Sequence, residues 1–475
     1  MELTIRKFGF DDIEKKIEWI NNPENNTYLH YDLPLEYDKT VKWFKENKDN
    51  KNRFDFVIEV DEKPVGLIGI LSIDYQRKNG EYYICMGEVA YKKRGIAKKA
   101  SNLLLNFAFN KIGLENIYLY TEVSNIPALK SFKKIGFNLL EGIENIINYK
   151  DREVKRFVLN ISKADFYLKN QNTPINNLNT FNKNNIFIKR DDLIAYSFGG
   201  NKARKAIKFF QYIDFLKSDY VVTYGSSHSN HCRIVANLAA KRNIPCLIIS
   251  PKESSDKTKN SIFMKLFGAN IITVPVEKVS ETIDKKLEEL RNMGYKPYFI
   301  PGGGHGNIGT QAYLECYEEI KKYETRNNIK FDYIFLASGT GTSQAGLVCG
   351  KILNNDKIKI IGISIARKNP RGRDIIKDSI RQYLPTIEEK IVDENTIFVD
   401  DYVLSGYSGY DEEIINTIKE NMINYGIPMD STYTAKAYLG MKKYLISKKI
   451  KDKNILFIHT GGTPLFFDDL DKLKV

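Results

Sequence analysis

The sequence predicts two α/β units in one chain of 475 residues, an N-terminal mixed-sheet unit followed by a larger unit with open twisted sheets. Three observations support this fold class. Apolar segments with the period of strands alternate with helical segments along most of the chain. A polar, asparagine-rich stretch over residues 163–185 interrupts that alternation. Beyond it, apolar strands repeatedly end in loops of glycine and hydroxyl residues. We place the boundary near residue 164, giving units 1–163 and 164–475.

The first unit is expected to begin with a strand and a helix that ends before Pro23. Residues 54–74 alternate as a hairpin whose turn lies at Asp61 to Lys63. The elements expected after it are a strand over 81–90, a helix over 98–112, a strand over 117–123 and a helix over 127–136.

In the second unit a lysine, Lys202, follows a double glycine in the stretch GGNKARK. Residues 197–201 favour a turn, and the residues after them favour a helix with Ile207 and Phe210 on one side. Lys202 is therefore expected in the first helical turn, where backbone N–H groups favour anions. The alternative is a solvated lysine beside a glycine turn.

Four loops form the companions of this stretch. Each follows an apolar run, and they cover residues 224–233, 301–309, 338–346 and 459–462. Open α/β sheets build ligand sites at the carboxyl ends of their strands. The sequence therefore predicts that these loops gather around Lys202.

Composition limits the classes of partner and compartment. The net charge is +13, but the lysines are spread in pairs rather than gathered in one block, which argues against nucleic-acid binding. No apolar run is long enough to span a bilayer, and Met1 does not lead into a signal peptide. The five cysteines are scattered, which favours a cytoplasmic protein, and no histidine spacing predicts a metal site.

Seven stretches in order, over about three hundred residues, carry a family resemblance: FIKRDDL, FGGNKARK, SSHSNHCR, IPGGGHGNIG, SGTGTSQAGL, DSTYTAK and HTGG. The second unit resembles the fold type II, tryptophan-synthase-β-like pyridoxal phosphate enzymes. Within these it is most similar to the 1-aminocyclopropane-1-carboxylate deaminase and D-cysteine desulfhydrase family. The resemblance implies a homodimer that acts on small molecules.

The resemblance implies the roles of individual residues. Lys202 would carry pyridoxal phosphate as a Schiff base and then move the Cα proton of the substrate. Ser229 and His231 would hold the substrate carboxylate or assist proton transfer, and Tyr407 and Tyr433 would lie near the substrate. Further residues expected at the cofactor are Asn201 and Asn230 beside the ring, Thr434 and Thr460, and the phosphate loop Ser338, Gly339, Thr340, Gly341, Thr342 and Ser343.

Two departures from the family pattern bear on the reaction. Ring-opening deaminases have a glutamate after the second tyrosine, and here it is Thr434, whose hydroxyl cannot keep the pyridine nitrogen protonated as a carboxylate does. This favours β-elimination, β-replacement or Cα proton exchange over ring opening. His228 stands where the family usually has glutamine, and it either alters the substrate pocket or is merely tolerated.

The first unit resembles the GNAT N-acetyltransferases. Its loop Lys92–Ala97 matches their Arg-x-x-Gly-x-Gly/Ala pattern, and SNIPALKSFKKIGF matches a second segment with Asn125, Ala128, Gly136 and Phe137 in place. The resemblance implies that acetyl-CoA is held by Lys93, Arg94, Gly95, Ala97 and Asn125. The acceptor would be a small amine, with nucleotide-linked amino sugars suggested by SIDYQRKNGEYYICMGE.

One substitution affects acetyl transfer. Phe132 occupies the place of the tyrosine that protonates the departing thiolate in many GNAT enzymes. The acceptor amine must also lose a proton, and Glu88 and Glu122 are candidate bases, each with the alternative of a structural carboxylate. An inactive first unit that serves as a scaffold or ligand sensor is therefore a second hypothesis.

The fusion of the units leaves the relation between two activities open. β-Elimination produces no carbon-bound amine for acetylation, whereas racemisation or β-replacement followed by acetylation would. Alternatively, the units serve one pathway without sharing an intermediate. A basic nucleic-acid-binding protein is the third and weakest hypothesis.

Overall fold

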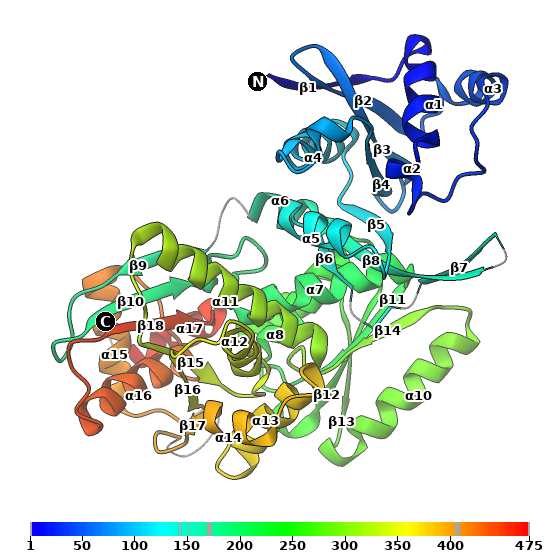
Figure 1. Ribbon diagram of the computed structural model, residues 1–475. Coiled ribbons are helices and arrows are strands. Elements are labelled where there is room, and N and C mark those ends of the chain that lie inside the picture. Colours follow the sequence, from blue (N-terminus) through cyan, green and yellow to red (C-terminus); the bar gives the residue numbers. More distant parts are fainter. Residues whose placement is uncertain are drawn as a thin grey trace. The chain divides into compact units, whose positions relative to one another are not determined.

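The computed structural model describes residues 2–140, 142–143, 145–150, 152–168, 173–403 and 409–473. The chain forms two compact units, Met1–Gln171 and Asn172–Val475 (Figure 1). The division falls after the predicted boundary because α6 (Lys163–Leu168) packs on the first unit. There Lys163 Nζ donates to the Phe109 carbonyl at 3.0 Å, and the rings of Phe109 and Phe166 are 5.5 Å apart.

The first unit is built on a mixed sheet with the strand order β1-β2-β3-β4-β5-β8-β6, and β7 pairs with β8. Its strands are β1 (Leu3–Lys7), β2 (Phe54–Val60), β3 (Lys63–Asp74), β4 (Asn79–Met86), β5 (Asn116–Glu122), β6 (Asn138–Leu139), β7 (Asn145–Tyr149) and β8 (Arg152–Ser162). Its longer helices are α1 (Ile13–Asn21), α3 (Tyr37–Asn47), α4 (Ile96–Phe107) and α5 (Ile126–Ile135), and the short α2 (Pro23–Asn26) follows α1.

The hairpin β2–β3 forms at the predicted turn. Val60 pairs with Lys63, and the two residues between them, Asp61 and Glu62, have φ values of 48° and 63°. Positive φ at both central residues is the geometry of a type I′ turn, whose twist matches that of the strands. The predicted strand over 81–90 is shorter than expected and ends at Met86.

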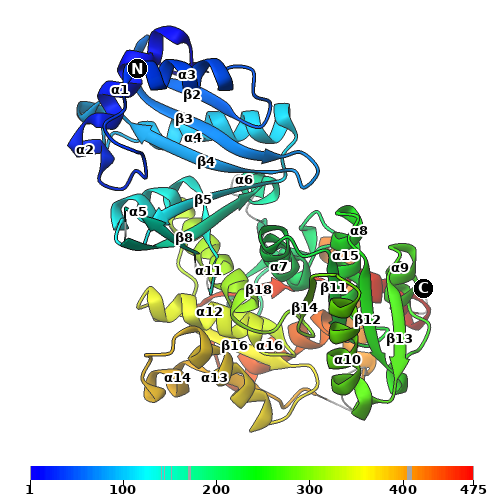
Figure 2. The same cartoon turned by 90° about the vertical axis from the view of Figure 1, so that its right-hand side faces the viewer.

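Strands β4 and β5 form a parallel pair over a short register only, Asn79–Glu81 with Asn116–Tyr118. Beyond this register the two strands separate toward their carboxyl ends (Figure 2). The glycine loop that opens α4 follows β4, and α5 follows β5. The gap between the strands therefore opens beside the starts of two helices.

The second unit contains two open sheets. The larger has the order β17-β16-β15-β18-β10-β9, and the smaller is a parallel sheet with the order β13-β12-β11-β14. The strands are β9 (Ile175–Asn177), β10 (Asn185–Arg190), β11 (Tyr220–Tyr224), β12 (Cys246–Pro251), β13 (Asn270–Val274), β14 (Pro297–Ile300), β15 (Tyr333–Ser338), β16 (Lys359–Ser364), β17 (Ile397–Val399) and β18 (Asn454–His459).

The helices of the second unit cover these sheets. They are α7 (Asn201–Leu216), α8 (Asn230–Lys241), α9 (Lys259–Leu266), α10 (Val279–Asn292), α11 (Asn307–Asn327), α12 (Thr342–Leu353), α13 (Arg371–Tyr383), α14 (Glu389–Asn395), α15 (Glu412–Tyr425), α16 (Thr434–Ser447) and α17 (Thr463–Asp469). Among the residues described, none of the helices combines the length and apolar character needed to cross a membrane.

Close packing of α11 on α12 supports the larger sheet. A Cβ atom on Gly346 of α12 would lie 2.3 Å from the Thr310 carbonyl oxygen and 2.6 Å from Cβ of Tyr313. One turn on, a Cβ on Gly350 would lie 2.7 Å from Cβ of Tyr317. Because Gly346 and Gly350 have no side chains, two buried tyrosines of α11 lie directly against the backbone of α12.

We expect Gly346→Ala to destabilise the second unit by about 1–3 kcal/mol, because the added methyl group meets backbone that cannot move without shifting α11. Chemical denaturation followed by far-UV circular dichroism would measure this loss. Gly9→Ala is the control, since its Cβ would meet its nearest neighbour at 3.5 Å. Equal stability of the Gly346 variant and the parent would contradict the packing argument.

Candidate active site

The turn before Lys202 interlocks with the loop after β18. Gly199 and Gly200 have φ values of 61° and 95°, and a Cβ on Gly200 would lie 2.6 Å from the Thr460 carbonyl oxygen. A Cβ on Gly461 would lie 2.6 Å from Cα of Gly200, and Asn201 N donates to the Thr460 carbonyl at 2.9 Å. Glycine is required on both sides, and the contact fixes the start of α7.

A cavity of about 360 Å³ lies at the carboxyl ends of the strands in the second unit. The four glycine and hydroxyl loops meet there, as the sequence predicts. Predicted site residues that line it are Asn201, Lys202, Ser229, Asn230, Ser338, Gly339, Thr340, Gly341, Ser343, Tyr433 and Thr460. Thr342 and Thr434 do not line it, and Tyr407 lies outside the described residues.

Lys202 is held as a reactive amine within this cavity. Its Nζ donates to the Gly303 carbonyl at 3.0 Å. Burial and the nearby charge of Arg367 lower the pKa of Lys202 to about 8. At such a pKa a larger fraction of the amine is neutral near physiological pH than in an ordinary lysine, and the neutral form is the one that acts as a nucleophile or base.

Arg367 also lines the cavity, and sequence reasoning did not identify it. Its Nη1 donates to the Gly339 carbonyl in the loop before α12. Neither aspartate nor glutamate occurs among the described lining residues. The cavity therefore presents two cationic side chains without an acidic counterpart, and this favours anionic ligands.

The start of α12 supplies a second anion-binding feature. Gly341, with φ 83°, lets the loop turn into the helix, and a Cβ there would lie 2.9 Å from Cγ1 of Ile376. The hydroxyl groups of Thr340 and Ser343 lie at the cavity, and Asn201 Nδ2 donates to Ser343 Oγ at 3.2 Å. Free backbone N–H groups at a helix start bind phosphate.

The side chain of Thr342 faces elsewhere. It is fully buried, and its Oγ1 lies 2.7 Å from Nδ1 of His305. Adjacent residues on a helix point about 100° apart, and here Ser343 lines the cavity while the Thr342 hydroxyl contacts His305. The expected hydroxyl contact from Thr342 to a phosphate is therefore not supported, although its backbone remains at the helix start.

The start of α8 forms the opposite wall. Ser229 caps the helix, and its Oγ accepts from Cys232 N at 3.1 Å. Thr223 Oγ1 donates to the Ile300 carbonyl at 2.8 Å, so it accepts from His231 Nε2 at 3.0 Å. Burial and the charge of Lys202 hold the pKa of His231 well below its usual value. The neutral ring leaves Nδ1 without a proton, so this nitrogen cannot donate to a substrate carboxylate.

Thr434 is bonded to a buried carboxylate. Its Oγ1 donates to Asp430 Oδ1 at 2.7 Å, and Asp430 also accepts from the backbone N–H groups of Thr432, Tyr433 and Thr434. Burial raises the pKa of Asp430 to about 6. Asp430 thus binds the N–H groups at the start of α16. The Thr434 hydroxyl donates its proton to Asp430 and is not available to donate to a ligand.

The remaining histidines have local partners. His228 does not line the cavity, and its Nδ1 lies 3.3 Å from Ser227 Oγ. The buried His459 contacts the Pro428 carbonyl through Nε2 at 2.8 Å. Among the described residues no group of histidine, cysteine, aspartate and glutamate could hold a metal ion.

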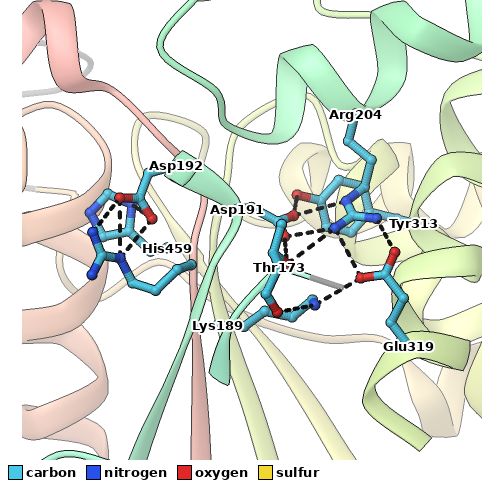
Figure 3. A network of polar contacts seen from close by, with 9 residues as sticks. Thr173, Lys189, Asp191, Asp192, Arg204, Tyr313, Glu319 and His459 are labelled. Atoms are coloured by element: carbon cyan, nitrogen blue, oxygen red, sulfur yellow. Dashed lines mark hydrogen bonds and ion pairs between the residues drawn. The ribbon is translucent and has the colours of Figure 1, made fainter. Parts of the chain in front are cut away.

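A buried ionic network anchors the helix that carries Lys202 (Figure 3). Arg204 lies two residues after Lys202 on α7. It donates to both carboxylate oxygens of Asp191, at 2.8 and 3.0 Å, and to Glu319 at 2.7 Å. Asp191 also accepts from Thr173 and Tyr313, each at 2.8 Å. Burial opposes ionisation of Asp191, but Arg204 and Lys189 hold its pKa at about 2.

In the first unit, the loop before α4 has the form expected of a phosphate cradle. Lys93 and Gly95 have φ values of 62° and 78°, and α4 begins at Ile96. Lys93, Arg94 and Gly95 are exposed, whereas Ala97 is half-buried within the first helical turn. The first N–H groups of α4 have no intrahelical partner and are the donors that such a cradle needs.

Asn125 caps α5 at the end of the gap between β4 and β5. Its Oδ1 accepts from Ala128 N at 3.2 Å. The capping bond gives this residue a structural role and leaves only its amide N–H groups for a ligand.

Fold and site together define an enzyme with two domains, the second of which has a cavity centred on a buried lysine. Family models match both: "Pyridoxal-phosphate dependent enzyme" over residues 167–461 and "Acetyltransferase (GNAT) domain" over residues 2–138. The chain belongs to the family of pyridoxal-phosphate dependent enzymes, and its first unit is a GNAT acetyltransferase domain.

Relatives of the second unit carry two enzyme names. A Pyrococcus horikoshii protein named "Putative 1-aminocyclopropane-1-carboxylate deaminase" is 32% identical over 311 residues, covering 63% of this chain and 92% of the relative. A Serratia proteamaculans D-cysteine desulfhydrase is 29% identical over 302 residues, covering 59% and 88%.

Solved structures match each unit separately. The crystal structure of an ACC deaminase homologue has a TM-score of 0.57 at 30% identity, covering 64% of this chain and 93% of that one. A Vibrio cholerae spermidine N-acetyltransferase covers 35% and 98% at 21% identity, with a TM-score of 0.33.

The cofactor and cosubstrate are pyridoxal phosphate and acetyl-CoA. The residues of the second unit fit pyridoxal phosphate. They include a buried amine of lowered pKa, glycines at positions where any side chain would obstruct the cavity, and a helix start for the phosphate. A Cβ on Gly303, for example, would lie 3.2 Å from Lys202 Nζ. The exposed loop before α4 fits the pyrophosphate of acetyl-CoA.

We expect the rate at which the apoenzyme takes up pyridoxal phosphate to rise with pH through about 8, since only neutral Lys202 attacks a carbonyl group. Absorbance spectroscopy would follow the uptake. Arg367→Gln should move the midpoint to higher pH, because removing a neighbouring positive charge favours the charged amine. A midpoint that is unchanged in this variant would refute the electrostatic explanation.

We expect Arg204→Gln to destabilise the second unit by about 3–5 kcal/mol, since Asp191 would remain buried without its main partner. Denaturant unfolding would measure the loss. Arg381→Gln is the control: its partner Glu389 and Arg381 itself are 52% and 40% exposed, and such pairs contribute about 1 kcal/mol or less. Similar losses in both variants would argue against the anchoring role of Arg204.

Proposed function

We propose that this protein is a bifunctional enzyme. Its first domain would transfer the acetyl group of acetyl-CoA to a small amine, an amino sugar or an amino acid. Its second domain would act at Cα and Cβ of an amino acid and catalyse β-elimination, as D-cysteine desulfhydrases do. The main support for the second activity is that Lys202, with its lowered pKa, shares one acid-free cavity with Ser229 and Tyr433.

In the second domain the chain's own groups would divide the work. The start of α8, capped by Ser229, would hold the substrate carboxylate, and Lys202 Nζ would remove the Cα proton. Bound pyridoxal phosphate supplies the electron sink for that proton loss. Tyr433, which lines the same cavity, would protonate a departing group at Cβ.

The environment of Thr434 supports elimination rather than ring opening. The position carries a hydroxyl group that is already bonded to Asp430, and no carboxylate lines the cavity among the residues that the structure describes. The ring nitrogen would therefore lack the acidic partner that strengthens the electron sink. A β-leaving group lowers the demand on that sink because it accepts the electron pair.

In the first domain, the N–H groups at the start of α4, with Lys93 and Arg94, would bind the pyrophosphate of acetyl-CoA. Phe132 offers no proton to the thiolate, so water would supply it. We also infer a cytoplasmic homodimer. The five cysteines are buried and none is in a disulfide, which supports the compartment. Light scattering on the purified protein would test the dimer.

The proposed function would be tested by mass spectrometry of the cofactor-loaded protein incubated with D- and L-amino acids and with amino sugars, with and without acetyl-CoA. We expect a keto acid and ammonia from a D-amino acid with a β-leaving group, and a separate acetylated amine. Lys202→Ala should abolish the first reaction and leave the second unchanged.

Other products would revise this proposal. An inverted or β-substituted amino acid that then becomes acetylated would assign racemisation or β-replacement to the second domain. Loss of acetyl transfer in the Lys202 variant would show that the domains run consecutive steps. Failure to acetylate any amine would favour a scaffold role for the first domain.

A further inference from the structure

The segment that follows α1 spans the gap between the separated ends of β4 and β5. On the β4 side, Asn25 Nδ2 donates to the Gly87 carbonyl at 2.9 Å. On the β5 side, His30 Nε2 contacts Glu122 Oε1 at 3.0 Å. Since the acetyl-CoA loop begins at the same end of β4, this segment places His30 and Glu122 beside the region where acetyl transfer would occur.

Glu122 is held by three groups and is only 10% exposed. Its Oε1 accepts from His30 and, at 3.4 Å, from Arg152 Nη2, while its Oε2 accepts from Ser124 Oγ at 3.2 Å. Contacts from three elements thus fix the carboxylate. A carboxylate can only accept, so it selects the His30 tautomer that carries its proton on Nε2.

His30 is held in turn from its other side. The ring centroids of His30 and Tyr149 lie 4.9 Å apart, and Tyr149 Oη donates to the Tyr31 carbonyl at 2.6 Å. The side chain of His30 is 20% exposed, and no described residue is hydrogen bonded to its Nδ1. The ring therefore has a fixed orientation and a lone pair available to accept a proton. Glu122, Arg152, Tyr149 and Tyr31 are the titratable groups described around it.

Glu88, the other carboxylate near the gap, lacks such an arrangement. Its Oε1 accepts from Trp19 Nε1 at 2.9 Å, and Lys15 lies 3.8 Å away. The side chain is 36% exposed. Glu88 thus holds Trp19 in place, and among the described residues it contacts no histidine that could act as a base.

On the thiolate side, the described surroundings of Phe132 include one phenol in ring contact with it, that of Tyr82. The two ring centroids lie 6.0 Å apart. Ser101 Oγ donates to the Ala97 carbonyl at 2.6 Å, so the Tyr82 hydroxyl must donate its proton to Ser101. The Tyr82 proton is therefore used in a hydrogen bond within the core and is not available to the thiolate. Proton transfer by a protein side chain would then concern the acceptor amine.

We propose that His30 is a catalytic base of the first domain and that Glu122 positions it. His30 Nδ1 takes one proton from the acceptor ammonium, and Glu122 stabilises the imidazolium that results. The free amine then attacks the acetyl carbonyl: the N–C bond forms, the C–S bond breaks, the thiolate gains the second amine proton through water, and His30 returns its proton to solvent. This inference rests on the proposed acetyl transfer.

Two acceptor amines would separate catalysis from structure. At about pH 6.5 glucosamine is mostly an ammonium ion and needs a base, whereas methoxyamine is already neutral. With acetyl-CoA as donor, we expect His30→Gln to lower kcat/KM for glucosamine about 100-fold and to leave methoxyamine nearly unchanged. Glu122→Gln should show the same selectivity with a smaller loss. Titration calorimetry with acetyl-CoA would verify that each variant keeps its cosubstrate site.

Glu88→Gln is the matched control, a second carboxylate at the gap, and it should not distinguish the two amines. Equal losses for both amines in His30→Gln would overturn the inference and assign His30 a structural role. A parent enzyme that acetylates neither amine would instead contradict the acetyltransferase function itself, and the inference would fall with it. A parent enzyme active on both amines, with His30→Gln unimpaired, would exclude His30 as the base.

Discussion

The ion pair between Arg204 and Asp191 is the interaction on which the second domain's site depends. Both groups are buried, so removing either one would leave the other as an incompletely paired buried charge. Asp191 also accepts the backbone N–H of Gly200 through its carbonyl, at 2.8 Å, and its side chain meets α11 through Tyr313. One residue thereby ties together the end of β10, the glycine turn and two helices, through its backbone carbonyl and its carboxylate. The position of Lys202 follows from this network rather than from contacts of its own side chain.

The two domains control protons by different means. In the second, burial and a neighbouring cation make a lysine amine available as a base. In the first, a carboxylate fixes the tautomer of a histidine without deep burial. The difference suits the two reactions, because an amine bound to a cofactor must be kept dry, whereas an acceptor amine must enter from solvent and leave as an amide.

The sequence predicts the fold class and the meeting of the four loops because glycine and hydroxyl residues at strand ends have a direct structural meaning. Periodicity cannot locate Arg367, which follows β16 without a glycine motif, or Asp430, whose carboxylate lies behind Thr434. His30 lies in an irregular segment and contacts a residue 92 positions away. Thr342 and Ser343 are neighbouring hydroxyl residues in the sequence. Only the direction in which each side chain leaves the helix shows that they contact different groups.

The contact between Gly200 and Gly461 has a consequence for the order of folding. These glycines are separated by nearly the whole second domain, yet each occupies space that the other's side chain would need. The turn before Lys202 is thus completed by a loop far downstream in the chain. A nascent chain can assemble its acetyltransferase domain from the residues up to Gln171, but it gains a cofactor-competent lysine only when β18 has joined the sheet. Folding of the first domain and completion of the lysine site would therefore be separate events during synthesis.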